Sequence, residues 1–184
     1  MKTEITPVDI LDFWYEPPMS EHWFTSTPAI DAAILACYQA LWEKAGAGEL
    51  AAWQESADGC LALCIVLDQF PLNMFRGQAR SFSTEQQAVA VTKHAVAQGF
   101  DALLPTDRLA FLYMPLMHSE HLADQDESVR LLDASGLEGN AHFARHHREL
   151  VRRFGRFPHR NAVLGRVSTA DEVAYLNSKE AFTG

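Results

Sequence analysis

The sequence predicts an all-α protein, and three observations support that class. Apolar residues recur at spacings of three and four, most clearly from Ile30 to Trp42, which is the periodicity of an amphipathic helix. Threonine or serine precedes several such segments, and proline or glycine follows them, as at helix ends. The one apolar run that would also fit a strand, 60–67, has no neighbouring strand candidate to complete a ladder.

The first helices are defined by their end residues. Thr6 and Thr27 stand at N-cap positions, each followed by a proline that suits the first helical turn. Pro17-Pro18 ends the first helix, and the glycines near residue 46 end the second. The run at 60–67 is expected to be a buried helix that ends at Pro71.

Two helices are expected in the middle of the chain. Ser83 with Gln86 forms a capping box and opens a helix that continues to about residue 98. Thr106 caps the next helix, and Pro115 is expected to stop it.

The last third of the sequence predicts three more helices. Ser119 opens one that ends at Gly136, and Thr169 with Glu172 caps a short final helix. The segment 141–154 lies between them. Its apolar face is expected to carry Phe143, His147, Leu150, Val151 and Phe154. About eight helices with short connections suit a single compact domain over residues 1–184.

Composition places the chain among ordinary globular proteins. It has 184 residues, of which 48% are hydrophobic and 21% charged, so long disordered stretches are not expected. Cys37, Cys60 and Cys64 have no CxxC spacing, and their odd number argues against a disulfide framework. Neither a signal peptide nor a membrane-length apolar stretch is visible. We therefore expect a cytoplasmic protein with reduced thiols.

The charge is unevenly distributed. The chain carries a net charge of −9, but residues 141–166 hold seven arginines against the single acid Glu149. One interpretation is that these arginines pair with the acidic remainder of the domain, because guanidinium groups suit carboxylates. The alternative is a local anion site. The acidic total disfavours a nucleic-acid partner, since such binding neutralises phosphates.

Three segments are richer in polar and aromatic residues than packing requires. They read LDQFPLNMFRG at 67–77, YMPLMHSE at 113–120 and FGRFPHRN at 154–161, the last followed by LGR at 164–166. Each contains a proline and is expected at a helix end, where backbone groups lack helical partners and ligands often bind.

These segments resemble the signature stretches of DUF924, an uncharacterised bacterial protein family, and the resemblance covers nearly the whole chain. It implies an all-helical fold similar to the tetratricopeptide-repeat superfamily and no established activity. Leu72 departs from the pattern, which has arginine at that position. The resemblance therefore gives no support for an anion-binding role at residue 72.

Eight residues of the three segments are candidate ligand-binding residues: Asp68, Arg76, His118, Glu120, Arg156, His159, Arg160 and Asn161. Among them, His118, Glu120 and His159 are the candidates for catalysis, because imidazole and carboxylate groups transfer protons. Arginine and amide groups suit an anionic or carboxylate ligand.

Structural roles are open for the same residues. Asp68 could instead form an ion pair with Arg76 or with an arginine of the third segment, and Asn161 or His159 could cap a helix. His121 and Asp124 near His118 lack the spacing of zinc helices, so no metal is predicted. No cofactor is predicted either, since phosphate loops and dinucleotide motifs are missing.

Two functional hypotheses are consistent with these residues. The first is a small helical module that binds a ligand or a protein through a polar Arg/His/Asp pocket. The alternative is an enzyme of unknown class, with hydrolysis among the options, acting on a small anionic substrate through His118 or His159 and arginines. Geometry distinguishes them: convergence of the six side chains Asp68, Arg76, His118, Glu120, His159 and Arg160 on one pocket favours the enzyme, whereas their separation at different helix junctions makes them structural. We expect at least four of the six to converge. The sequence identifies neither the partner nor the oligomeric state.

Overall fold

The computed structural model describes residues 4–182, and within that range every regular element is a helix. The α-helices are α1 (Pro7–Tyr15), α2 (Pro28–Gly46), α3 (Ala57–Cys64), α4 (Phe70–Met74), α5 (Glu85–Ala97), α6 (Thr106–His118), α7 (Leu122–Ser135), α8 (Glu138–Phe154) and α9 (Ala170–Leu176). A π-helical segment, Ile65–Gln69, and five short 3-10 helices join them. The all-α fold class is confirmed.

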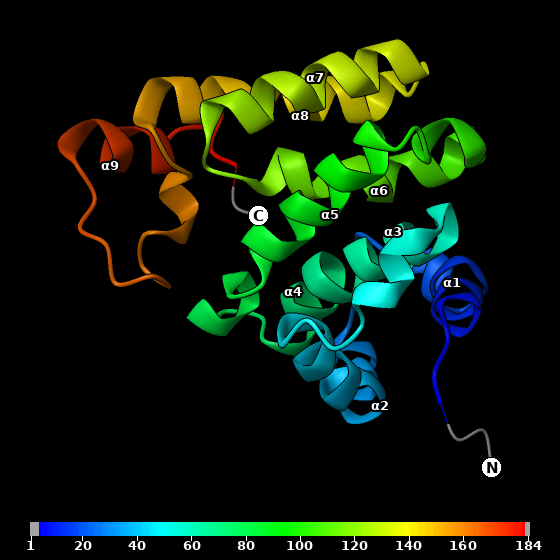
Figure 1. Ribbon diagram of the computed structural model, residues 1–184. Coiled ribbons are helices and arrows are strands. Elements are labelled where there is room, and N and C mark those ends of the chain that lie inside the picture. Colours follow the sequence, from blue (N-terminus) through cyan, green and yellow to red (C-terminus); the bar gives the residue numbers. More distant parts are fainter. Residues whose placement is uncertain (1–3, 183–184) are drawn as a thin grey trace.

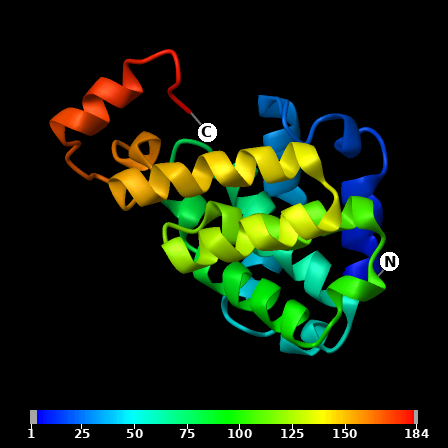
Figure 2. The ribbon, with the colours of Figure 1, turned by 90° about the horizontal axis from the view of Figure 1, so that it is seen from above.

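The helices pack in chain order from one end of the molecule to the other. Helices α1 and α3 are in contact, as are α2 and α4, and α5 and α6 follow in the middle (Figure 1). Helices α7 and α8 lie side by side across the opposite end, and α9 projects beyond the end of α8 (Figure 2). The similarity to tetratricopeptide repeats stays a prediction.

Two apolar cores support these helices. The larger includes fully buried side chains such as Trp14, Phe70 and Leu112. The smaller is built by Leu150, Val151, Phe157 and Tyr175, and it joins the end of α8 to α9. Cys60 and Cys64 are buried in the larger core as free thiols, as expected. None of the described helices is both long and apolar enough to cross a membrane.

Pro71 does not end the helix that begins at Ala57, contrary to expectation. The chain widens into the π-helical segment, in which the Phe70 amide donates to the Ile65 carbonyl, and continues as α4. Proline has no N–H for the Leu67 carbonyl four residues earlier. The Thr84 hydroxyl donates to that carbonyl instead, at 2.6 Å, so the helix continues.

Pro115 does not stop its helix either, since α6 continues to His118. All residues from Phe111 to Met117 are buried, and packing of this face outweighs the preference of proline for a helix end. The Thr92 hydroxyl also donates to the Leu112 carbonyl at 2.8 Å, which ties this part of α6 to α5.

The threonine caps at both ends of the chain are confirmed, but three central caps were wrong. Ser83 donates to the Arg80 carbonyl, and α5 begins after Thr84. Thr106 is the first residue of α6 rather than its cap. Ser119 bonds the Asp124 carboxylate at 2.7 Å, and α7 begins three residues later. Phe143, expected on the apolar face of α8, is 53% exposed.

Candidate functional site

The first two polar segments meet through a carboxylate and an imidazole. Asp68 lies in the π-helical segment and is only 4% exposed, and its two carboxylate oxygens lie 2.8 and 3.0 Å from Nδ1 of His118, the last residue of α6. Gln69 donates to the same carboxylate through Nε2. Single π-helical turns inside helices are frequent at functional sites. Here the turn places Asp68 against His118.

The opposite nitrogen of His118 remains available. Carboxylate oxygens accept hydrogen bonds, so this contact favours the tautomer that carries its proton on Nδ1 and leaves Nε2 as an acceptor. Within residues 4–182, no protein group hydrogen-bonds to Nε2. The His118 side chain is 18% exposed, which gives the ring limited access to solvent.

The third segment joins this pair through Arg160. Its Nη2 donates to the His118 carbonyl at 2.9 Å, and its Nη1 donates to Glu85 Oε2 at 2.8 Å. The guanidinium carbon also lies 4.5 Å from the centroid of the Phe82 ring and 4.7 Å from that of Phe157. The Arg160 side chain is therefore held in place by its ion pair with Glu85 and by the faces of two aromatic rings.

Glu85 is a member of this cluster that the sequence analysis missed. Burial raises the pKa of its carboxyl, although the nearby Arg160 guanidinium opposes that shift. A glutamate in the first turn of a helix is common, so its sequence position carried no signal of the contact with Arg160, 75 residues away.

Glu120 also contacts the third segment, through Phe157 and Arg166. Its carboxylate accepts two hydrogen bonds from Arg166, at 2.6 and 2.9 Å, and one from the Phe157 amide at 2.7 Å. Burial acts to raise the pKa of Glu120, but these hydrogen bonds dominate and lower it. Glu120 therefore holds the third segment in place as an ionised carboxylate, and no free proton donor is expected there.

Arg156 and Asn161 belong to a separate junction. Arg156 forms two hydrogen bonds with Glu172 of α9, at 2.7 and 2.8 Å, and Asn161 donates to the same carboxylate at 3.2 Å. The Arg156 guanidinium is the main reason that the pKa of Glu172 falls to about 2. These residues attach α9 to the third segment.

Arg76 also lies apart from Asp68, His118 and Arg160, and the ion pair between Arg76 and Asp68 that the sequence suggested as one possibility was wrong. Its guanidinium bonds Asp31 of α2, at 2.8 and 3.2 Å, and the Asn73 side chain at 3.1 Å. Asp68 faces His118 instead. The arginine lies beyond the end of α4, where the chain turns toward α2.

Four of the six residues expected to converge, Asp68, His118, Glu120 and Arg160, therefore lie near one another. Asp68 bonds the His118 ring, whereas Arg160 bonds the backbone carbonyl of His118. Glu120 bonds the backbone of Phe157, whose ring contacts Arg160. We call Asp68, Glu85, His118, Glu120 and Arg160 the polar cluster.

The arginine-rich segment mostly pairs with carboxylates, as the first interpretation predicted. Six of its seven arginines have such a partner within 4.0 Å: Arg145, Arg148, Arg152, Arg156, Arg160 and Arg166. The seventh, Arg153, lies instead over the Phe154 ring, at 4.6 Å.

Two further histidines, His147 and His159, lie in apolar surroundings next to Phe157. His147 Nδ1 donates to the Phe143 carbonyl, 2.8 Å away, and the His147 ring contacts those of Phe157 and Phe182. His159 lies against the same two rings. Burial lowers the pKa of His147 to about 3 and that of His159 to about 4. Both are therefore neutral at physiological pH.

This burial predicts acid destabilisation. The unfolded chain takes up protons at these histidines below pH 6.5, whereas the folded protein does not until about pH 3 to 4. The free energy of unfolding is therefore highest above pH 6.5 and falls as pH decreases, by up to about 1.4 kcal/mol per pH unit for each histidine. Urea unfolding at pH 7, 6 and 5 should show a shallower pH slope for His147→Gln. An unchanged slope would contradict the role of His147, and exposed His142→Gln is the control.

Together, the fold and the site define an all-helical protein with a buried aspartate–histidine pair surrounded by interhelical ion pairs. The chain belongs to the family described as bacterial protein of unknown function (DUF924), which it matches over residues 10–180. It is also similar to the solved structure of ATU0120, a protein of unknown function from Agrobacterium tumefaciens. The identity is 38% and the TM-score 0.87, with 93% of this chain and 96% of that chain covered. No curated protein matches the sequence significantly.

Proposed function

We propose that the protein binds a small molecule at His118 and that the Asp68–His118 pair equips the site for proton transfer. One observation carries this proposal. A nearly buried carboxylate bonds Nδ1 of His118, while Nε2 has no hydrogen-bonding partner among the described residues. A carboxylate that fixes the tautomer of a histidine prepares the other nitrogen to accept a proton.

The charges of the polar cluster favour a neutral ligand that donates a hydrogen bond. Arg160 is paired with Glu85 and Arg166 with Glu120, so neither guanidinium is free to hold an anion. An anionic substrate would also meet the Asp68 and Glu85 carboxylates. A hydroxyl or amide N–H can instead donate to His118 Nε2 without a counter-charge.

The enzyme hypothesis is the second candidate, and the same aspartate–histidine pair favours it. In that case His118 acts as the general base toward a ligand hydroxyl or a water molecule, and Asp68 stabilises the imidazolium that forms. Asp68 is then a positioning residue, because it contacts His118 and not the ligand.

The test is chemical modification of His118 by diethyl pyrocarbonate, which acylates neutral imidazole nitrogen. We expect modification of His118 in the folded protein, at a rate that falls several-fold in Asp68→Asn, whereas the rate at exposed His142 stays the same. Fragments found by NMR screening should protect His118, and His118→Gln should abolish their binding while His142→Gln retains it. Lack of reaction at His118 in the folded wild type would refute an available Nε2.

A further inference from the structure

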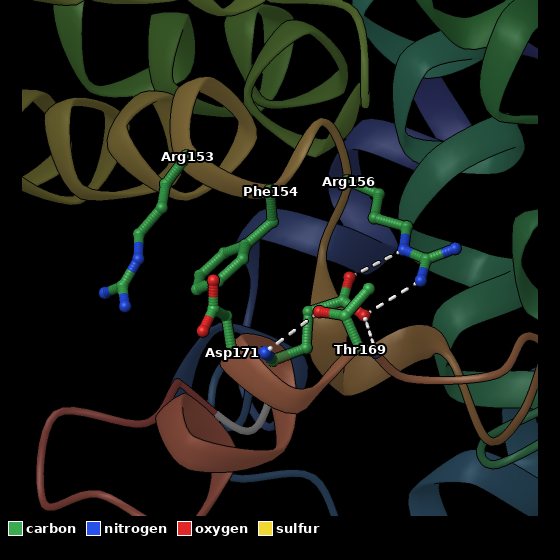
Figure 3. A pocket seen from close by; sticks show the side chains of 6 residues that line it. Arg153, Phe154, Arg156, Thr169 and Asp171 are labelled. Atoms are coloured by element: carbon green, nitrogen blue, oxygen red, sulfur yellow. Dashed lines mark hydrogen bonds and ion pairs between the residues drawn. The ribbon is translucent and has the colours of Figure 1, made fainter.

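A second site lies outside the polar cluster, where the end of α8 meets the start of α9. It is an open pocket of about 360 Å³, lined by Arg153, Phe154, Arg156, Thr169, Asp171 and Glu172 (Figure 3). Its volume is at the lower end of the range for small-molecule sites. His118 does not line it, so binding in this pocket does not depend on the proposed function.

One side of the pocket is rigidly held. Glu172 is 2% exposed and bonds both Arg156 and the Thr169 amide. The Phe154 ring packs against Tyr175 with ring centroids 5.3 Å apart, which ties the pocket to the smaller core. Arg156 and Glu172 therefore neutralise each other and are committed to the structure.

The two remaining charged residues form no close ion pair in the described structure, although the Glu149 carboxylate one turn earlier on α8 acts on Arg153 from a distance. Arg153 forms no ion pair within residues 4–182 and lies over the Phe154 ring, 4.6 Å from its centroid. Asp171 likewise has no cationic partner in the described structure. Figure 3 shows both beside the Phe154 ring, with the Asp171 carboxylate next to the ring edge. Among the described residues, the pocket thus offers one cation and one anion outside any close ion pair, next to an aromatic ring.

We propose that this pocket binds a zwitterionic small molecule, specifically an amino acid with an apolar side chain. Arg153 pairs with the ligand carboxylate, Asp171 pairs with the ammonium group, and Phe154 contacts the apolar part. A simple anion fits less well, because Asp171 would repel it. A simple cation meets the same objection from Arg153. Only a ligand with both charges satisfies the two groups together.

The proposal can be tested with three related probes: L-phenylalanine, N-acetyl-L-phenylalanine, which lacks the ammonium group, and L-phenylalaninamide, which lacks the carboxylate. Titrations followed by backbone amide NMR should show saturable shifts at Phe154 and Asp171 with L-phenylalanine. Each derivative should bind about tenfold more weakly, as expected for loss of one charge-assisted contact.

Variants then assign each contact. Asp171→Asn should weaken binding of L-phenylalanine but leave binding of the N-acetyl derivative unchanged. Arg153→Gln should weaken L-phenylalanine and leave the amide unchanged. Arg145→Gln is the matched control, because Arg145 is on the same helix, pairs with Asp133 and does not line the pocket. Equal affinity for all three probes, no saturable shift up to the solubility limit of L-phenylalanine, or insensitivity to both pocket variants would overturn the proposal.

Discussion

Replacing Phe157 by alanine is expected to lower the free energy of unfolding by about 3–5 kcal/mol, the usual cost of removing a large buried aromatic side chain. Phe157 is completely buried and belongs to the smaller core. Its ring also contacts His147, with centroids 5.4 Å apart, and the guanidinium of Arg160. The substitution therefore leaves a cavity and removes one of the aromatic faces that hold Arg160.

Guanidinium denaturation of wild type and variant measures this loss. Phe143→Ala is the matched control, because Phe143 is on α8 and 53% exposed, so its loss should change stability by no more than about 0.5 kcal/mol. Trp14→Ala, in the larger core, should cost as much as Phe157→Ala. Losses below about 1 kcal/mol at both buried positions would contradict the core assignment.

The fold class could be predicted from the sequence because several helices begin at residues that favour helix ends. Thr6 and Thr27 cap their helices as the sequence predicts, since a threonine hydroxyl acts on an amide three residues away. Pro71 and Pro115 were misread because distant residues decide the outcome. The hydroxyl of Thr84 takes up the Leu67 carbonyl, and no local pattern shows that contact.

Four of the five members of the polar cluster were predictable as a group, but Glu85 and the pairing of the charges were not. Asp68, His118 and Arg160 stand in segments whose polar and aromatic density indicated a shared site. Their hydrogen-bonding partners could not be predicted, since Glu85 is 75 residues from Arg160 in the sequence. The chain has 24 acidic residues, and the packing of the helices selects which of them each arginine meets.

Arg76 shows the same limit. It stands eight residues after Asp68, close enough in sequence to suggest an ion pair, yet it bonds Asp31 of α2. The turn after α4 directs the chain toward α2, and the packing of α2 against α4 brings Asp31 within reach. Separation along the sequence was therefore a poor guide to charge pairing.

Glu172 is the residue whose charge is expected to matter most for stability. It is 2% exposed and accepts hydrogen bonds from Arg156, Asn161 and the Thr169 amide. Glu172→Gln keeps the size of the side chain but removes its charge, so we expect a loss of about 2–3 kcal/mol, the range for a hydrogen bond to a charged group. Urea unfolding at pH 7 measures it. Glu149→Gln is the control, since the Glu149–Arg152 pair is on the surface and should contribute nothing measurable.

The pH dependence separates loss of charge from loss of packing at Glu172. The pKa of this carboxyl is about 2 in the folded protein, against 4.5 for an ordinary glutamate. Its contribution is therefore complete above pH 4.5 and disappears as pH falls toward 2, because the unfolded chain binds the proton first. The stability difference between wild type and Glu172→Gln should shrink over that range. A difference that stays constant between pH 7 and the lowest pH at which both proteins remain folded would show that the variant disturbs packing, and that the ion pair with Arg156 contributes little to holding α9 in place.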